Sequence, residues 1–402
     1  MNLCNNDGFV NFIMPIKWSN GAMGKGLRRI CSENKAAQRI INFGSYQVFN
    51  ASTYTALQWF KKDSDVLLYN ELDRDLLSNK ELSGYLEGLT KPDFSEIPSD
   101  KLNAETWVLT PKENNEILIK LMCQPCVVSD FFYKIFQGLA TGKDDVFFLH
   151  QCKYNENIVI AYSNMLGSDV ELEIGIVKPL LKGEDVHRYD NIKTDRIVLL
   201  PYMQDYSLMK ESYIQTNYPK AYSYLKLFEK ELKDRENGRF DIDGKWFQFS
   251  RKQGLTSAET MKLVAPEISL GGNYAFDEKG QFYSTTKIYG YIKKNDVKSS
   301  YKSLMAILNS KVMWYFMRNT GYVLRGGYYT FKTNYVKPFP MPSDEAIIAI
   351  EPVLIPLVDK VLLAKKNNPK ADTSTEEREI DNIVFDLYGL TEEERNEIIK
   401  ES

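Results

Sequence analysis

A run of alternating prolines, Lys337-Pro-Phe-Pro-Met-Pro342, is the feature that most constrains how this chain can fold. Proline fixes φ and lacks an amide hydrogen, so regular structure does not pass through the run and a boundary is expected there. Residues 241–340, before the boundary, carry 15 Lys and Arg against 7 Asp and Glu, with 19 aromatic residues. The residues after Ser343 carry 15 acidic and 7 basic side chains. Charge is therefore segregated, and the basic, aromatic segment is suited to a polyanion.

The length of 402 residues predicts two or three domains, each with its own core. Its apolar runs are too short for a bilayer, which needs about 20 residues, so we expect no contact with a membrane. The start, Met-Asn-Leu-Cys-Asn-Asn-Asp, has neither the cationic nor the apolar part of a signal peptide. Five cysteines, an odd number, fit a reducing compartment. These observations predict a cytoplasmic protein.

The N-terminal residues have the pattern of an α/β sheet edge. Residues 9–15, 38–43 and 54–60 are predicted as strands, and a short helix begins near Leu27. Such a fragment is too small to fold without further apolar cover. The polar, proline-punctuated stretch that follows is predicted as a connecting region with one or two short helices.

Further along the chain, residues 131–149 predict a β-hairpin, because two β-rich runs flank a Gly-x-x-x-Gly turn. Residues 217–235 and 301–316 predict helices from their apolar spacing. Beyond residue 343, further acidic helices are expected, and two of them have capping-box signatures at Ser374-x-x-Glu377 and Thr391-x-x-Glu394. We expect these helices to cover an apolar face of the same protein.

Several motifs suggest chemistry but have simpler interpretations. The glycine-rich loop Gly21–Gly26 lacks the spacing of a phosphate or dinucleotide site and is interpreted as a turn. Cys123-Gln-Pro-Cys126 has no second pair at zinc-finger spacing, so unliganded cysteines are favoured. His150 and His187 are interpreted as surface or strand-edge residues rather than as bases. Glu231-x-Lys233 lies on an amphipathic helix, where charge is usually solvated. No metal site is predicted.

The basic, aromatic segment has two interpretations, one as core and solubilising surface and the other as a DNA interface. Arginine and glutamine can read guanine and adenine edges, while lysines hold phosphates. The residues next to glycines, in loops or at strand ends, favour the second interpretation. The candidate DNA-binding residues are Lys182, Arg188, Lys245, Trp246, Arg251, Lys252, Gln253, Asn273, Tyr274, Lys287, Arg325, Tyr328, Tyr329 and Lys332.

The order of several motifs along nearly the whole chain is informative. They are Phe12-Ile-Met-Pro-Ile-Lys-Trp18, Leu27-Arg-Arg29, Ile40-Ile-Asn-Phe-Gly44 with Val48-Phe49, Gln137-Gly-Leu-Ala-Thr-Gly142 with Val146-Phe-Phe148, Tyr218-Pro-Lys-Ala-Tyr-Ser-Tyr-Leu225, Trp246–Arg251, Leu304-Met-Ala-Ile-Leu-Asn-Ser-Lys311, Ile380-Asp-x-x-Val384 and Leu387-Tyr-Gly-Leu390. This order resembles the C-terminal half of a TaqI-like, adenine-specific DNA methyltransferase of a type II restriction-modification system, including the fused restriction and modification enzymes.

The resemblance implies a fold that is α/β and α+β. Residues 1–62 would be an incomplete, Rossmann-like edge of a methyltransferase domain, and residues 63–119 a connecting region. Residues 120–342 would be a mixed α+β TaqI-like specificity domain that recognises the DNA target, and residues 343–402 the acidic C-terminal helices. The family's S-adenosylmethionine-binding glycine motif and its Asn-Pro-Pro-Tyr catalytic motif are absent from this sequence. No cofactor is therefore expected in this chain, although the complete family enzyme uses S-adenosylmethionine, and no catalytic residue is assigned.

The favoured hypothesis is therefore a DNA recognition module of an adenine methyltransferase, inactive in methyl transfer by itself, with double-stranded DNA as its partner. A second hypothesis is a complete enzyme of unrecognised chemistry, which would show turnover or a bound metal. A third is an interaction protein that docks through residues 1–62 on a separately encoded catalytic methyltransferase or restriction subunit.

Overall fold

The computed structural model describes residues 8–400 except 45, 47, 50–53, 73–81, 105, 106, 108, 110 and 111. The chain divides into two compact units. Unit 1 comprises Met1–Val128, Lys311–Ser343 and Phe385–Ser402, and unit 2 comprises Ser129–Ser310 and Asp344–Val384. Both units combine sheets with helices, so the predicted α/β and α+β class is confirmed. None of the helices within the described ranges is long and apolar enough to cross a membrane.

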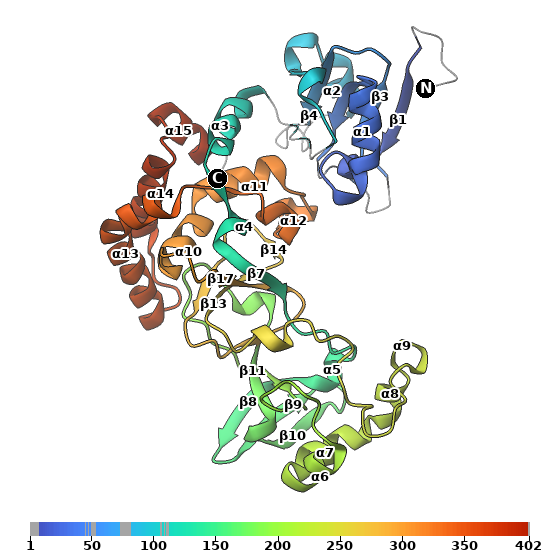
Figure 1. Cartoon of the computed structure of the whole chain (residues 1–402), viewed down its shortest axis with the longest axis vertical. Helices are drawn as coiled ribbons and strands as arrows, with labels where there is room; N and C mark the ends of the chain where they lie inside the picture. Colours follow the sequence, from blue (N-terminus) through green and yellow to red (C-terminus); the bar gives the residue numbers. More distant parts are fainter. Residues whose placement is uncertain are drawn as a thin grey trace. The chain divides into compact units, whose positions relative to one another are not determined.

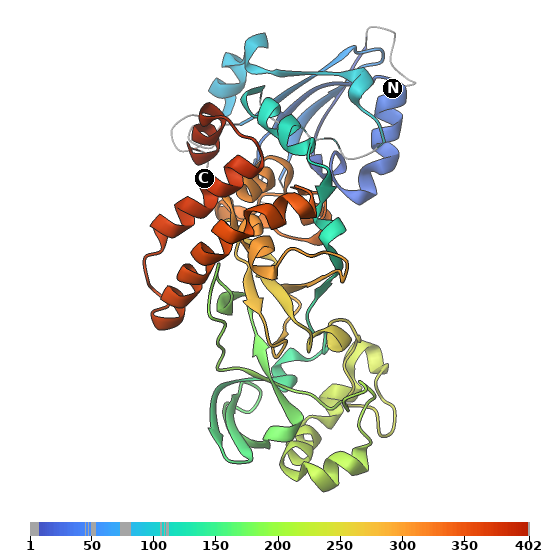
Figure 2. The same cartoon turned by 60° about the vertical axis from the view of Figure 1, so that its left-hand side comes forward.

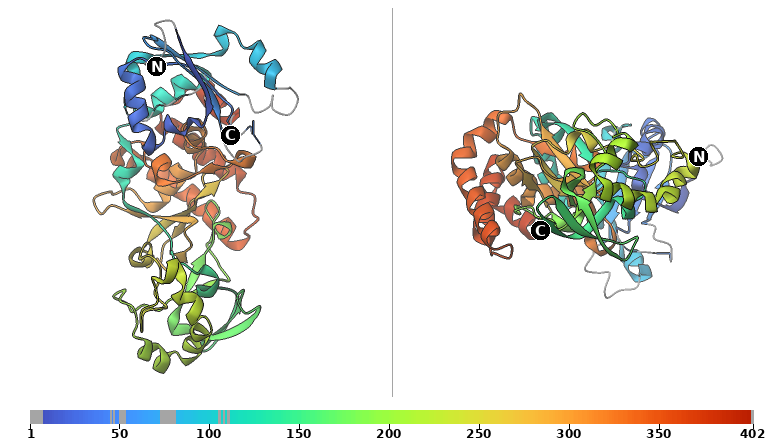
Figure 3. Two further views of the ribbon diagram at one scale, coloured as in Figure 1. Left: turned by 90° about the vertical axis from the view of Figure 1, so that its right-hand side faces the viewer. Right: turned by 90° about the horizontal axis from the view of Figure 1, so that it is seen from below.

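Unit 1 contains a five-stranded sheet with the order β1-β3-β2-β4-β5, in which only β2 and β4 are parallel neighbours (Figure 1). Its strands are β1 Val10–Met14, β2 Ala37–Asn42, β3 Ala56–Phe60, β4 Val66–Glu71 and β5 Ser95–Pro98. Helix α1, Lys25–Glu33, joins β1 to β2 and packs along one face, as Figure 3 shows in blue. Cys31 of α1 is buried there with Ile40 and Phe60. The predicted helix and three strands are confirmed.

The sheet extends beyond the predicted edge of residues 1–62. Strands β4 and β5 lie in the stretch expected to connect two domains, and Val66 of β4 pairs with Pro98 of β5. Residues 66–71, Val-Leu-Leu-Tyr-Asn-Glu, bury Leu67 and Tyr69 and leave Leu68 half-buried, as a strand covered on both faces does. The short helices expected in this stretch are present as α2, Leu82–Gly88, and α3, Lys112–Met122.

The rest of unit 1 comes from later segments of the chain. They supply β6 Cys126–Val127, α11 Lys311–Thr320, β18 Tyr329–Thr330, α12 Thr333–Val336, β19 Pro340–Met341 and α15 Glu392–Lys400. The proline run is thus partly a strand, because β19 pairs with β6 at the unit's own edge. Thr391 and Glu394 form the predicted capping box of α15, with Thr391 N donating to Glu394 Oε2 at 2.7 Å.

Unit 2 contains two larger sheets. One has the order β15-β13-β17-β7 and the other β10-β9-β8-β12-β11-β16. Their strands are β7 Phe132–Gln137, β8 Phe148–Asn155, β9 Ile158–Ser163, β10 Ser168–Glu173, β11 Val177–Leu181, β12 Ile197–Leu199, β13 Lys262–Pro266, β15 Ala275–Asp277, β16 Tyr283–Ser284 and β17 Ile288–Lys293; a short β14 spans Ile268–Ser269. The predicted hairpin over residues 131–149 is wrong, because β7 pairs with β17 while β8 pairs with β9 and β12.

The helices of unit 2 are more broken than the apolar spacing predicts. Residues 217–235 split at Phe228, whose backbone (φ −114°, ψ 16°) is not helical, and Phe228 is buried against Tyr224. Residues 301–316 split at Ser310. The helices are α5 Asp144–Phe147, α6 Glu211–Asn217, α7 Pro219–Leu227, α8 Glu229–Lys233, α9 Arg235–Gly238, α10 Tyr301–Asn309 and α13 Asp344–Asn367, while α4 Val128–Phe131 and α14 Ser374–Leu387 pass from one unit into the other.

The first acidic helix covers an apolar face, as expected. α13 packs against α10 and buries Ile347, Leu354 and Val361, although Pro352 and Pro356 lie inside it. The two long orange-red helices in Figure 2 are α13 and α14. At the start of α14, Glu377 accepts a hydrogen bond from Thr373 Oγ1 at 2.6 Å rather than capping Ser374.

A buried ion pair joins β13 to β15. Lys262 lies opposite Asp277, and both side chains are only 1% exposed. Lys262 Nζ donates to Asp277 Oδ2 at 2.5 Å and to the carbonyl oxygen of Ala258 at 2.6 Å. Asp277 also accepts hydrogen bonds from the backbone amides of Gln281 and Phe282. Burial lowers the pKa of the Lys262 ammonium, and the attraction of Asp277 opposes this shift.

Candidate nucleic-acid interface

Three loops of unit 2, residues 138–143, 250–254 and 284–287, are joined by their main chains and form what we call the loop cluster. Leu139 N donates to Ser284 O at 2.7 Å, and Arg251 N donates to Ala140 O at 3.2 Å. Ser250 N donates to Thr141 O at 3.1 Å. The 138–143 loop is thus held between the other two. Two motifs that are about 110 residues apart in the sequence, Gln137–Gly142 and Trp246–Arg251, meet here.

Glycines permit this close approach. A Cβ on Gly138 would lie 2.1 Å from Ser284 O, so no other residue fits without moving the backbone. Gly254 has φ +72°, and its Cβ would lie 2.7 Å from Gln137 O. The left-handed backbone favours glycine by roughly 1–2 kcal/mol, and the contact adds to that preference. The glycines of the Gln137–Gly142 motif therefore serve backbone packing between loops.

The loop cluster carries exposed cations. The Arg251 side chain is 61% exposed, and its Nη1 lies 3.5 Å from Glu236 Oε1. The Lys287 side chain is 69% exposed, with Nζ 3.9 Å from Glu267 Oε2. The long, exposed Arg251 pair is worth about 0–1 kcal/mol, so this cation can exchange its carboxylate for another anion. In the Lys287 pair the cation is exposed, whereas the Glu267 side chain is only 8% exposed. Lys252 is exposed, and its side chain has no hydrogen bond or ion pair within the described part of the chain, although its carbonyl oxygen accepts from Leu255 N at 3.3 Å.

Lys182 adjoins the same surface. It follows β11, whose last residue, Leu181, accepts a hydrogen bond from Thr285 N at 3.0 Å. Its charge attracts Asp144, which follows the 138–143 loop. The pKa of Asp144 is raised because protein atoms surround its carboxyl, although Thr141 Oγ1 donates to it at 2.5 Å. Lys182, Arg251, Lys252 and Lys287 thus lie on segments that main-chain hydrogen bonds join, and the DNA contact predicted for each from the sequence remains a prediction.

Gln253 and Lys245 are more peripheral. Gln253 is half-buried, and its Nε2 donates to Gly138 O at 3.3 Å, so the amide helps to tie the loops together. Lys245 is exposed at the start of the segment that leads to the loop cluster. Both remain predictions as DNA contacts.

Three of the predicted aromatic contacts are corrected by the structure. Trp246 is 1% exposed and lies in the same core as Phe247 and Phe249. Tyr274 is fully buried, with its ring against Tyr291. Tyr329 is 1% exposed and packs edge-on against Trp314. Large aromatic side chains contribute most to folding stability when they are buried, because burial removes much apolar surface from water. For these three rings that gain outweighs the benefit of leaving the ring exposed to a ligand.

Two polar candidates are also held internally. Arg188 Nε lies 2.9 Å from Glu377 Oε2, and Nη2 donates to Asn309 O at 2.9 Å. Asn273 Nδ2 donates to Ser269 Oγ at 2.7 Å, and its Oδ1 accepts from Arg188 N. Arg188 thus joins the start of α14 to the end of α10 within unit 2. Both side chains are assigned to the scaffold rather than to a DNA contact.

The remaining candidates belong to unit 1. Arg325 and Tyr328 are exposed at a turn in which Gly326 and Gly327 have φ near +80°. Lys332 is exposed just before α12. These residues form a group of their own, and their role in DNA binding stays a prediction.

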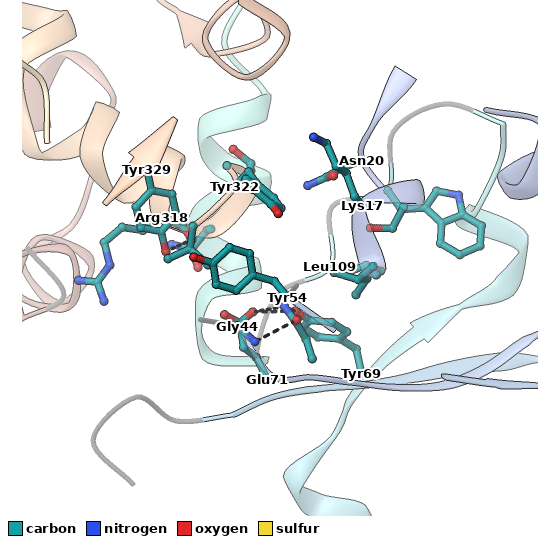
Figure 4. Close-up of a pocket in the computed structure, with 18 residues that line it drawn as sticks. Lys17, Asn20, Gly44, Tyr54, Tyr69, Glu71, Leu109, Arg318, Tyr322 and Tyr329 are labelled. Atoms are coloured by element: carbon teal, nitrogen blue, oxygen red, sulfur yellow. Dashed lines mark hydrogen bonds between the residues drawn. The ribbon is translucent and has the colours of Figure 1, made fainter. Parts of the chain in front are cut away.

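Unit 1 also contains a small hollow, shown in Figure 4. Tyr69 donates a hydrogen bond to Glu71 Oε2 at 2.6 Å on one side of it. Tyr54 and Tyr322 meet edge-on with ring centroids 5.8 Å apart, and Lys17 Nζ lies 4.9 Å from the centroid of the Tyr322 ring. The cavity volume is about 80 Å³, whereas ligand pockets usually span about 300–1,000 Å³. The hollow is therefore not assigned to a drug-sized ligand.

At the glycine-rich loop Gly21–Gly26, Gly24 is not open to form a cradle for S-adenosylmethionine. A Cβ on Gly24 would lie 1.8 Å from Trp18 O, so this glycine is packed against backbone and leaves no room for a ligand. Arg28 of α1 is buried and donates to Trp18 O and Gly21 O. The loop is a turn, as predicted: Ala22–Gly24 form a 3₁₀ turn, and Lys25 begins α1.

Other chemical candidates have local explanations. Within the described residues, no group of three or more His, Cys, Asp or Glu side chains could hold a metal ion. Cys123 is exposed and Cys126 half-buried, and neither forms a disulfide. His150 Nε2 is hydrogen-bonded to Asn164 Oδ1 at 2.9 Å on a strand edge.

Comparison with known proteins gives two family matches, each over part of the chain. Residues 178–341 match the TaqI-like C-terminal specificity domain, and residues 1–49 match the Eco57I restriction-modification methylase. The chain is a relative of the type II restriction-modification methyltransferases. The two matched ranges lie within the predicted regions 120–342 and 1–62, whose outer boundaries remain predictions.

Individual relatives agree with this family. The chain is 26% identical over 358 residues to the type II restriction enzyme and methyltransferase RM.Eco57I of Escherichia coli, covering 84% of this chain and 35% of that protein. It is 21% identical over 423 residues to the type II methyltransferase M.BstVI of Geobacillus stearothermophilus, covering 100% and 67%. The fold resembles that of the type IIL restriction-modification enzyme MmeI, solved in complex with DNA, with a TM-score of 0.56, 15% identity and coverage of 96% and 48%. The chain therefore spans one third to two thirds of these relatives' lengths.

Sequence reasoning missed one residue of the TaqI-like specificity domain. Arg235 looked like the end of an amphipathic helix, but it is 7% exposed and reaches the 138–143 loop. The sequence around Arg235 looks like that of an ordinary solvated helix end, so it does not indicate a buried contact with the 138–143 loop. Only the pairing of distant loops reveals it.

Proposed function

We propose that this chain is the sequence-specific DNA recognition portion of a type II restriction-modification adenine-N6 DNA methyltransferase. The loop cluster carries the proposal, because it presents Lys182, Arg251, Lys252 and Lys287 on a scaffold fixed by main-chain hydrogen bonds. Lysine ammonium groups neutralise phosphates, and an arginine fork can bind the O6 and N7 atoms of guanine. A rigid main chain beneath such side chains favours a defined geometry over a loose electrostatic contact.

The chain is further proposed not to transfer methyl groups by itself. The sequence contains no Asn-Pro-Pro-Tyr motif, which in the family holds the flipped adenine beside the methyl donor. Gly21 and Gly24 of the glycine-rich loop are packed against backbone carbonyl oxygens rather than open to a ligand, which is in line with the same proposal. We expect no labelled DNA when the purified chain is incubated with radiolabelled S-adenosylmethionine and duplex DNA. Labelling that depends on this chain would contradict the proposal.

The test of DNA recognition is binding of fluorescently labelled duplex DNA across a series of salt concentrations. The logarithm of the association constant is expected to fall with the logarithm of salt by about 0.9 per neutralised phosphate, hence by about 3.6 if each of the four cations meets one phosphate. Enrichment of one sequence from a randomised duplex library is expected as well. Absence of binding at low salt would reject the proposal.

A second candidate function is an interaction subunit for a separately encoded catalytic methyltransferase or nuclease. The edge strand β1 favours it, because Phe9, Phe12 and Ile13 are 41–59% exposed there. An apolar edge strand is suited to pairing with another chain. If the chain fails to bind duplex DNA but copurifies with such a subunit, this second function replaces the first.

A further inference from the structure

Arg235 occupies an unusual position between two segments of unit 2. Its Nη1 donates to Thr141 O at 2.6 Å, and its Nη2 donates to Trp246 O at 2.7 Å and Gln248 O at 2.9 Å. Its Nε donates to Leu232 O at 2.8 Å. All four acceptors are backbone carbonyl oxygens. One guanidinium thus joins the 138–143 loop, the segment before the 250–254 loop and the end of α8.

Thr141 O links Arg235 directly to the loop cluster. It accepts hydrogen bonds from both Arg235 Nη1 and Ser250 N. Arg251, the next residue, donates its amide to Ala140 O. Gly142, with φ +78°, brings the loop so close that its Cβ would lie 3.5 Å from Arg235 Nη1. Arg235 therefore fixes the Thr141 carbonyl group, to which the residue before Arg251 is hydrogen-bonded. The position of Arg251 depends on that carbonyl group.

Only arginine can make this set of contacts. A lysine ammonium is a point donor on a flexible stem, whereas the planar guanidinium directs its N–H groups in fixed directions. The ring of Phe240 lies over the guanidinium with its centroid 4.4 Å away. Burial lowers the pKa of Arg235 to about 10, and the attraction of Tyr202 and Glu236 opposes this shift. The side chain is thus still charged at neutral pH.

The backbone immediately after Arg235 is strained. Glu236 has φ +49° and Asn237 has φ +61°, and Gly238 follows with φ +81°. Left-handed backbone at residues other than glycine costs about 1–2 kcal/mol per residue. Such strain persists only where the surroundings over-determine the conformation, and the four contacts of Arg235 supply that constraint at the start of the turn.

We infer that Arg235 is a positioning residue for the loop cluster: it fixes the 138–143 loop against residues 246–250 and so sets where Arg251 and Lys252 are presented. Its relevance to DNA rests on the proposed function, whereas its effect on the loops does not. Arg235 touches no base itself in this inference.

The experiment compares the wild-type chain with Arg235→Lys and with Leu172→Ala. Leu172 is fully buried in β10, so its truncation destabilises the same unit at a residue outside the three loops of the loop cluster. Amide hydrogen exchange is measured at a temperature at which all three proteins are folded. Arg235→Lys is expected to speed the exchange of the Ser250 and Arg251 amides by about tenfold and to leave the amides of β9 and β10 unchanged. Leu172→Ala is expected to do the reverse.

The second readout is the ratio of affinities for a duplex that the wild-type chain enriches from a randomised library and for mixed-sequence duplex. Arg235→Lys is expected to lower this ratio by about tenfold, the equivalent of one mismatched base pair. Leu172→Ala is expected to leave it unchanged. An equal ratio in Arg235→Lys and wild type would overturn the inference for recognition.

The two proposals fail differently. Exchange in Arg235→Lys that matches the wild type, or that rises uniformly across unit 2, would overturn the positioning role. If the wild-type chain enriches no duplex while exchange rises only at residues 138–143 and 246–251, the proposed DNA function fails and the positioning role is supported.

Discussion

Replacing Lys262 by methionine is expected to lower the free energy of unfolding by about 3–5 kcal/mol, because it leaves the Asp277 carboxylate buried and without its cation. Both side chains are 1% exposed, so water cannot take the place of the ammonium. Methionine keeps most of the length and the apolar stem of lysine, which confines the change to the charge. The measurement is denaturant unfolding followed by tryptophan fluorescence.

Two further variants make the test of the ion pair specific. Lys279→Met removes an exposed lysine from the neighbouring turn and is expected to change stability by less than about 0.5 kcal/mol. Lys262→Met combined with Asp277→Asn removes the unpaired charge and keeps one acceptor oxygen, which serves one of the two amides, Gln281 N or Phe282 N, that bond different oxygens of Asp277. It is expected to recover part of the loss, since an uncharged amide costs less to bury. A loss below about 1 kcal/mol in Lys262→Met would contradict the prediction.

The second large effect concerns DNA. Changing Lys182, Arg251, Lys252 and Lys287 together to glutamine is expected to reduce affinity for mixed-sequence duplex by about three orders of magnitude at 0.1 M salt. Each phosphate contact contributes about 0.9 to the exponent of salt, so four lost contacts correspond to about 3.6 logarithmic units at that concentration. The four side chains are exposed or lie at loop ends, so the free energy of unfolding is expected to change little.

The matched control changes the exposed lysines Lys153, Lys230, Lys360 and Lys366 of the same unit to glutamine. Net charge falls by the same amount, but none of these residues belongs to the loop cluster. A shallow loss of affinity with an unchanged salt slope is expected. If both quadruple variants lose affinity equally, binding depends on net charge, and the loop cluster is not the DNA-binding surface.

The sequence allowed local features to be predicted well. Strands β1, β2 and β3 and helix α1 follow from apolar spacing, because neighbouring residues decide burial within an element. The exposed cations at 251 and 252 were also predictable, since glycine and polar neighbours favour a loop. Family resemblance added the order of the regions, which periodicity does not reveal.

The features that could not be predicted from the sequence depend on contacts between residues that are distant along the chain. Trp246 looked like part of a basic, aromatic surface, but the core of unit 2 buries its ring. Arg188 looked like a DNA contact, although a glutamate almost 190 residues later binds its guanidinium. The hairpin prediction failed for the same reason. β7 pairs with β17, about 150 residues away, instead of with the next β-rich run of the chain. Local propensity is a weak guide where long-range pairing decides the outcome.

The way in which the loop cluster is joined has an evolutionary consequence. Leu139, Arg251 and Ser250 connect the loops through their amides, and the acceptors are carbonyl oxygens that every residue type possesses. Side chains at positions 251, 252 and 287 can therefore be exchanged while the main-chain bonds between the loops persist. Under the proposed function, the preferred target sequence can then diverge between descendants at a small cost in folding stability, as long as the glycines at 138 and 254 are retained.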